Sequence, residues 1–85
     1  MIKSQRPEYD FRIIGRNLKL FRINKGLSVE QVRDYLMLGS LQAVYKWERG
    51  DSLPQADTLL ALLELYGVDK ISDITCVAPP QTFAA

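Results

Sequence analysis

Residues 28–50 read SVEQVRDYLMLGSLQAVYKWERG and contain two short helical patterns separated by Gly39-Ser40. Ser28 is followed three residues later by Gln31, which is the capping-box pattern of a helix N-terminus. Gly39-Ser40 is expected to break this first helix, and its serine can cap the next one. The stretch therefore predicts one helix that begins at Ser28 and another over about 41–49, joined by a turn of about three to four residues.

The second helix of this pair has one apolar side and one polar side. Val44 and Trp47 lie three residues apart and are expected to face the core, and Gly50 ends the helix. The opposite side carries Gln42, Tyr45, Lys46 and Arg49. Two short helices joined in this way, the second polar on its outer side, form the outline of a helix-turn-helix, in which the second helix enters the major groove of DNA.

Helical patterns also cover the sequence on both sides of this pair. A first helix over about 10–24, ended by Lys25-Gly26, is expected from apolar residues at spacings of three and four: Phe11, Ile14, Leu18 and Phe21. A fourth helix is expected over about 55–66, with a buried stripe of Ala56, Leu59, Leu60, Leu62, Leu63 and Tyr66.

A short fifth helix around 70–74 would place Ile71 and Ile74 over the core as a lid. The sequence thus predicts a compact all-α domain of about four to five helices over residues 10–77. An N-terminal arm is expected at 1–9 and a flexible tail at 78–85.

The composition allows one compact domain and excludes several kinds of site. The chain has 85 residues, of which 47% are hydrophobic, enough for a core. Its single cysteine, Cys76, cannot form an internal disulfide and is expected to be a small apolar filler. There is no histidine, so a Cys/His zinc site and the commonest general base are both missing. We therefore expect no metal, no cofactor and no enzymatic activity.

No apolar run approaches the roughly 20 residues needed to cross a bilayer. The N-terminus also lacks the apolar block of a secretory signal. We therefore expect a soluble cytoplasmic protein (bacterial cytoplasm or nucleoid) with no membrane partner.

The charges are distributed unevenly, although the formal net charge is only +1. Residues 1–50 carry ten Lys and Arg against five Asp and Glu, whereas residues 51–85 carry one base against five acids. A positive half beside a negative half suits a protein that turns one face to phosphate.

The stretch from Ile14 to Ile74 resembles the lambda-repressor-like (Xre-type, Cro/cI-type) helix-turn-helix DNA-binding domains. The most specific piece is WERGDSLP at 47–54, which closes the second helix of the pair. The other matching residues are Ile14-Gly15, Leu18, Arg22, Gly26-Leu27-Ser28, Tyr45-Lys46, Leu59-Leu60 and Tyr66-Gly67-Val68. Members of this family are mostly DNA-binding repressors, activators or antitoxins that act as dimers, so the resemblance implies double-stranded DNA as a partner.

The resemblance also implies roles for individual residues. It places base contacts at the start and outer face of the recognition helix, and phosphate contacts at the start of the preceding helix and around Arg49. The implied DNA-binding set is Ser28, Val29, Ser40, Leu41, Gln42, Ala43, Tyr45, Lys46 and Arg49. A structural ion pair between Arg22 and Glu48 is implied beneath the recognition helix.

Three features depart from the family's common pattern. Arg33 stands where a small residue is usual, and Val29 stands where a glutamine often holds phosphate. The stretch between Ser28 and Glu48 is one residue longer than the family's common pattern, with the extra residue within 37–41. Val29 leaves only the backbone to hold phosphate, and the longer turn shifts the start of the recognition helix, where Leu41 lies.

These observations favour a sequence-specific DNA-binding transcriptional regulator, a repressor in the simplest reading, that acts as a homodimer. Leu20, Ile23 and Leu65 fall off the apolar stripes, and an oligomer contact is expected through Leu65 and the fifth helix. A domain of this size has no evident room for a small-molecule pocket. The alternative is an antitoxin or protein-interaction module on the same fold, with weak or no DNA binding.

Overall fold

The computed structural model describes residues 8–77. Within this part the chain forms five helices: α1 (Phe11–Asn24), α2 (Val29–Leu36), α3 (Gln42–Arg49), α4 (Ala56–Tyr66) and α5 (Ser72–Thr75). The all-α architecture and the order of the helices are those predicted from the sequence. The expected tail at 78–85 and most of the expected arm at 1–9 lie outside the described residues.

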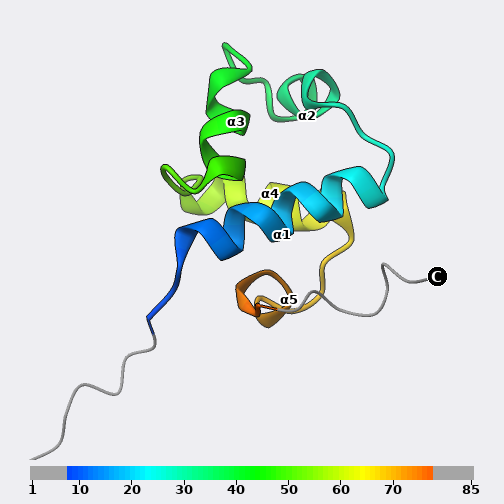
Figure 1. Cartoon of the computed structure of the whole chain (residues 1–85). Helices are drawn as coiled ribbons and strands as arrows, with labels where there is room; N and C mark the ends of the chain where they lie inside the picture. The colour runs from blue at the N-terminus through cyan, green and yellow to red at the C-terminus, as the bar shows by residue number, and fades with distance from the viewer. Residues whose placement is uncertain (1–7, 78–85) are drawn as a thin grey trace, which may run out of the picture.

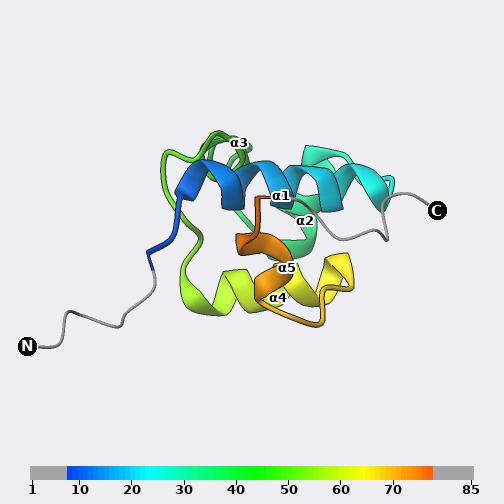
Figure 2. The ribbon, with the colours of Figure 1, turned by 60° about the horizontal axis from the view of Figure 1, so that its bottom comes forward.

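The first helix is the centre of the arrangement. α1 packs against α3 on one side and against α5 on another, and α2 packs against α3 and α4 (Figure 1). The view in Figure 2 shows α5 between α1 and α4. No helix in the described range is long and apolar enough to cross a membrane.

All five helices contribute apolar side chains to one core. Burying such a side chain stabilises the fold by about 1.5–3 kcal/mol, so this cluster is the main favourable term in folding. The buried members are Ile14, Leu18, Phe21, Val29, Val32, Val44, Trp47, Leu62, Leu63, Tyr66 and Ile74.

Hydrogen bonds of capping residues define the starts of α2 and α3, and a glycine ends α3. At the start of α2, Ser28 Oγ accepts the Gln31 N–H at 3.1 Å, and Gln31 Oε1 accepts the Ser28 N–H at 2.8 Å. The predicted capping box is therefore confirmed. Ser40 Oγ accepts the Gln42 N–H at 3.2 Å, and α3 ends at Gly50, whose φ of 84° is a left-handed conformation.

The predicted end of α2 at Gly39-Ser40 is wrong. α2 ends earlier, because Met37 takes the left-handed conformation at φ 57° and ψ 42°. The N–H of Leu38 then bonds to the Arg33 carbonyl at 3.0 Å. Leu36 and Leu38 both pack against the core, and the chain turns at the residue between them so that both can do so. The turn between α2 and α3 therefore spans residues 37–41.

Several side chains expected in the core lie at the surface instead. Phe11, Leu60 and Ile71 are 43%, 64% and 50% exposed, and Ala56 and Cys76 are also exposed. The apolar stripe of α1 extends one turn beyond the core, and the short α5 turns only one large apolar side chain inward. These positions were predicted wrongly because the sequence does not show where a neighbouring helix ends.

Leu65 shows the opposite error. It was expected to lie off the apolar side of α4, but it packs half-buried against the core. Leu65 follows Thr58 and Ala61 at helical spacings, and α2 covers that side of α4. The buried surface of α4 is therefore wider than one stripe.

Candidate nucleic-acid interface

α3 is anchored to the core on one side and open on the other. Val44 is 1% exposed and Trp47 is 8% exposed, as predicted from their spacing. The opposite side is formed by four exposed side chains that fall within one helical face: Gln42, Tyr45, Lys46 and Arg49. The helix therefore presents a continuous polar face while its other side is held by packing.

Backbone contact at Gly15 fixes the position of α3 on α1. Gly15 is buried, and a Cβ there would meet the carbonyl oxygen of Trp47 and lie 2.8 Å from that of Glu48. Only glycine fits at this crossing without a shift of one helix. The close approach brings the C-terminal half of α3 directly onto α1.

A buried ion pair joins the same two helices. Arg22 Nε donates to Glu48 Oε2 at 2.7 Å, and Arg22 Nη2 donates to Glu48 Oε1 at 3.1 Å. A third donor, Arg22 Nη1, bonds to the Leu27 carbonyl at 2.9 Å. The two side chains are only 11% and 7% exposed. The hydrogen bond to Glu48 raises the pKa of the Arg22 guanidinium above its ordinary value, although burial opposes this.

The pair that the resemblance implied is thus present, and its residues face inward. Arg22 and Glu48 hold α1, the loop after α1 and α3 together. Arg22 bonds to both the Glu48 carboxylate and a backbone carbonyl. These bonds compensate for the removal of the two charges from water. Neither side chain is available for DNA.

The N-terminus of α2 offers backbone donors rather than side chains. The Ser28 hydroxyl is engaged in the capping box, and Val29 is only 7% exposed. The first intrahelical donor of α2 is the Val32 N–H, which bonds to the Ser28 carbonyl at 3.1 Å, so the N–H groups of Val29 and Glu30 have no helical partner. Free N–H groups and the helix dipole favour an anion such as phosphate at this end.

The residues at the start of α3 are less accessible than those of its outer face. Ser40 is exposed, but its hydroxyl already accepts the Gln42 N–H. Leu41 and Ala43 are half-buried and pack against the core. Of the expected contact residues, the structure therefore brings Gln42, Tyr45, Lys46 and Arg49 together and leaves these others at the margin or partly covered.

Residues 13–71 match the family of helix-turn-helix domains. The chain belongs to the helix-turn-helix domain family. This family consists of DNA-binding domains of transcription regulators and not of enzymes. The match confirms the predicted helix-turn-helix domain and the expectation of a non-enzymatic protein.

Comparison with solved structures supports the same fold. The crystal structure of the clp gene regulator ClgR from C. glutamicum is similar with a TM-score of 0.67, at 18% sequence identity, over 85% of this chain and 90% of that chain. At this level of identity the likeness establishes the shared fold alone. No curated protein sequence matches the chain significantly.

In this helix-turn-helix domain α2 and α3 are the helix pair predicted from the sequence, and α3 stands where the recognition helix was expected. One ion pair at the end of α3 was not predicted from the sequence. Arg49 Nε and Nη2 both donate to Asp51 Oδ2, at 3.0 and 2.8 Å. The only signal in the sequence is an acid two residues after an arginine, and it becomes a contact because the chain reverses at Gly50.

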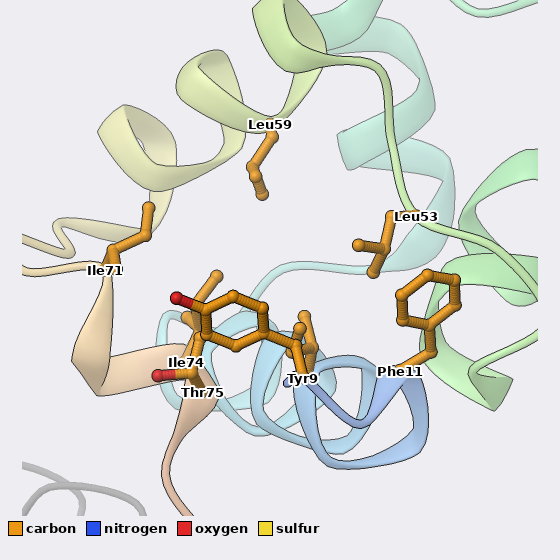
Figure 3. Close-up of a pocket in the computed structure, with 8 residues that line it drawn as sticks. Tyr9, Phe11, Leu53, Leu59, Ile71, Ile74 and Thr75 are labelled. Carbon is orange, nitrogen blue, oxygen red and sulfur yellow. The ribbon is translucent and has the colours of Figure 1, made fainter. Parts of the chain in front are cut away.

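An apolar groove on another face of the helix-turn-helix domain was also not anticipated. It encloses about 400 Å³ between the start of α1, the loop before α4, α4 and α5 (Figure 3). Two of its lining residues, Tyr9 and Thr75, carry a hydroxyl group. The lining residues are Tyr9, Phe11, Ile14, Leu53, Leu59, Ile71, Ile74 and Thr75. Segments far apart in the sequence form it, so no local pattern predicts it.

Proposed function

We propose that this helix-turn-helix domain binds double-stranded DNA in a sequence-specific manner, as a homodimeric transcriptional repressor in the cytoplasm. The observation that carries the proposal is the outer face of α3. Gln42, Tyr45, Lys46 and Arg49 are exposed together on a short helix whose other side is fixed by the core and by the Arg22–Glu48 pair. A narrow, braced helix with such a face fits the major groove.

The chemistry of this face assigns different tasks to its residues. Gln42 can bond bidentately to adenine, and Lys46 can donate to the guanine acceptors, which is worth about 1–3 kcal/mol of discrimination for a good pair. Tyr45, which is 40% exposed, can contact a thymine methyl group. Arg49 and the free N–H groups at the start of α2 suit phosphates, which set orientation rather than sequence.

Selection from a random-sequence duplex library tests the proposal. We expect enrichment of a short, two-fold symmetric site. Gln42→Ala and Lys46→Ala should then each weaken binding by about tenfold or more and relax the preference at one base pair. Gln55→Ala and Lys70→Ala are matched controls, because both residues are exposed outside this face. The controls should bind like the wild type.

Failure to enrich any site would favour the alternative function. If no duplex binds even at low salt, where attraction to phosphate is strongest, the domain is a protein-interaction module such as an antitoxin. Equal losses in all four variants would also contradict the assigned base contacts.

The apolar groove supports a second copy of the chain as the partner. Tyr9, Phe11 and Ile71 are about half exposed around it, and a repressor on a symmetric site needs two copies about one helical turn apart. Arg12 on α1 and Asp73 on α5 lie on elements that border the groove, so opposite charges can meet in a two-fold contact. Leu65 is not available for this contact, because it packs inward.

Sedimentation equilibrium of two isoleucine variants tests the dimer. Ile71→Ser should shift the protein toward the monomer, because Ile71 borders the groove. Ile23→Ser is the matched control, since Ile23 is exposed to a similar extent, 54%, at the other end of α1. A monomeric wild type, or an effect confined to Ile23→Ser, would rule out a dimer through the groove.

A further inference from the structure

The recognition helix carries two cations on its outer face, and one of them is already engaged. Lys46 and Arg49 are the basic residues of its last turn. Arg49 directs two N–H donors to a single oxygen of Asp51, at 3.0 and 2.8 Å. Half of the positive charge on this face is therefore balanced within the protein.

Helix stability does not account for the acid at this position. Asp51 follows the C-terminus of α3, where the helix dipole favours cations and disfavours a carboxylate. Its backbone N–H bonds to the Lys46 carbonyl at 2.9 Å, and any residue except proline can supply that bond. The side chain is 53% exposed and adds nothing to the core. In the described part of the chain, the Asp51 carboxylate bonds to Arg49.

We propose that Asp51 competes with DNA phosphate for Arg49 and thereby limits the affinity of the domain for DNA. The inference rests on the proposed function, because it concerns the same face. In the free protein the carboxylate occupies Arg49 Nε and Nη2. On the duplex a phosphate takes the place of the carboxylate, and the energy of the internal pair is subtracted from binding.

The size of the effect follows from the exposure of the pair. Arg49 and Asp51 side chains are 56% and 53% exposed, so the pair is a surface ion pair of modest strength. Breaking such a pair on binding lowers affinity by up to about fivefold. The repulsion between Asp51 and phosphate adds to this, but repulsion alone does not depend on Arg49.

A double-mutant cycle separates the two contributions. We would measure the affinity of wild type, Asp51→Asn, Arg49→Gln and the double variant for one selected duplex over a salt series. Asp51→Asn should tighten binding in both backgrounds, and by about two- to fivefold more when Arg49 is present. It should also steepen the dependence of log affinity on log salt by about one ion in the Arg49 background. Asp69→Asn, an equal charge change in the loop before α5, should change neither quantity.

The outcomes distinguish this inference from the proposed function. If Asp51→Asn tightens binding equally with Arg49 and with Gln at that position, Asp51 acts by repulsion alone and the competition is refuted. If Asp51→Asn weakens binding, the carboxylate orients Arg49 toward phosphate and the sign of the inference is wrong. If the wild type binds no duplex at low salt, the proposed function itself fails.

Discussion

The buried ion pair between Arg22 and Glu48 is the residue-scale feature on which the position of α3 depends. Arg22→Ala leaves the Glu48 carboxylate with 7% exposure and without its cation. We expect a loss of about 3–5 kcal/mol in the free energy of unfolding, measured by urea denaturation. Arg33→Ala is the matched control, because Arg33 pairs with the 70% exposed Asp34 and should cost less than about 1 kcal/mol. Equal losses would show that the buried pair has no special structural role.

Substitution of Met37 is expected to raise the free energy of unfolding rather than lower it. Met37 is the non-glycine residue with positive φ in the described part of the chain, and its side chain is 90% exposed. Met37→Gly removes the strain of the left-handed conformation and loses little packing, so it should stabilise the domain by about 0.5–1 kcal/mol. Met37→Ala keeps the Cβ and should be close to neutral. A destabilised glycine variant in the same urea titration would show that the methionine side chain contributes to the fold.

At the scale of the helices, the packing of α1 against α3 requires that Gly15 has no side chain. A methyl group on Gly15 would collide with the backbone carbonyls of α3, and backbone cannot move aside as a flexible side chain can. Gly15→Ala should therefore destabilise the domain by about 1–3 kcal/mol in thermal unfolding. Gly39→Ala is the matched control, because a Cβ at Gly39 meets open space. Tolerance of both substitutions would disprove the close crossing of these helices.

The helices themselves were predictable, whereas the turn inside the motif was not. Periodic apolar residues and the capping box at Ser28 located the helices, because those signals are local. The turn depended on whether Leu36 and Leu38 could both pack against the core, which is a property of the assembled fold. For the same reason the sequence indicated the break at Gly39, while the chain turns at Met37.

The candidate site also has a part that could be predicted from the sequence and a part that could not. Helical phase alone predicted the outer face of α3, and the structure shows its four side chains exposed. The Arg49–Asp51 pair and the groove were not predictable, because each requires segments to be brought together by a reversal of the chain or by packing of separate helices.

At the scale of the whole molecule, stability should depend on pH through Tyr66. Its side chain is 3% exposed, and burial raises the pKa of its phenol above the ordinary value, with a further increase from the Glu48 charge and an opposing effect of Arg22. A raised pKa means that the folded state favours the neutral phenol. The stabilisation is therefore complete below the ordinary tyrosine pKa of about 10 and is lost as the pH rises above it.

Tyr66→Phe should remove this alkaline dependence, as followed by the urea midpoint between neutral pH and pH values above about 10. Tyr35→Phe is the matched control, since Tyr35 is 50% exposed and should leave the alkaline loss unchanged. An alkaline loss that persists in the Tyr66 variant would assign it to other groups.

The central claim concerns the whole domain on DNA: the outer face of α3 and the start of α2 form the DNA-binding surface. Backbone amide NMR shifts of the domain, recorded with and without a selected duplex, test it most directly. The account predicts the largest changes at Val29, Gln42, Tyr45, Lys46 and Arg49, with little change in α5. Changes concentrated in α4 and α5, with α3 unaffected, would contradict it.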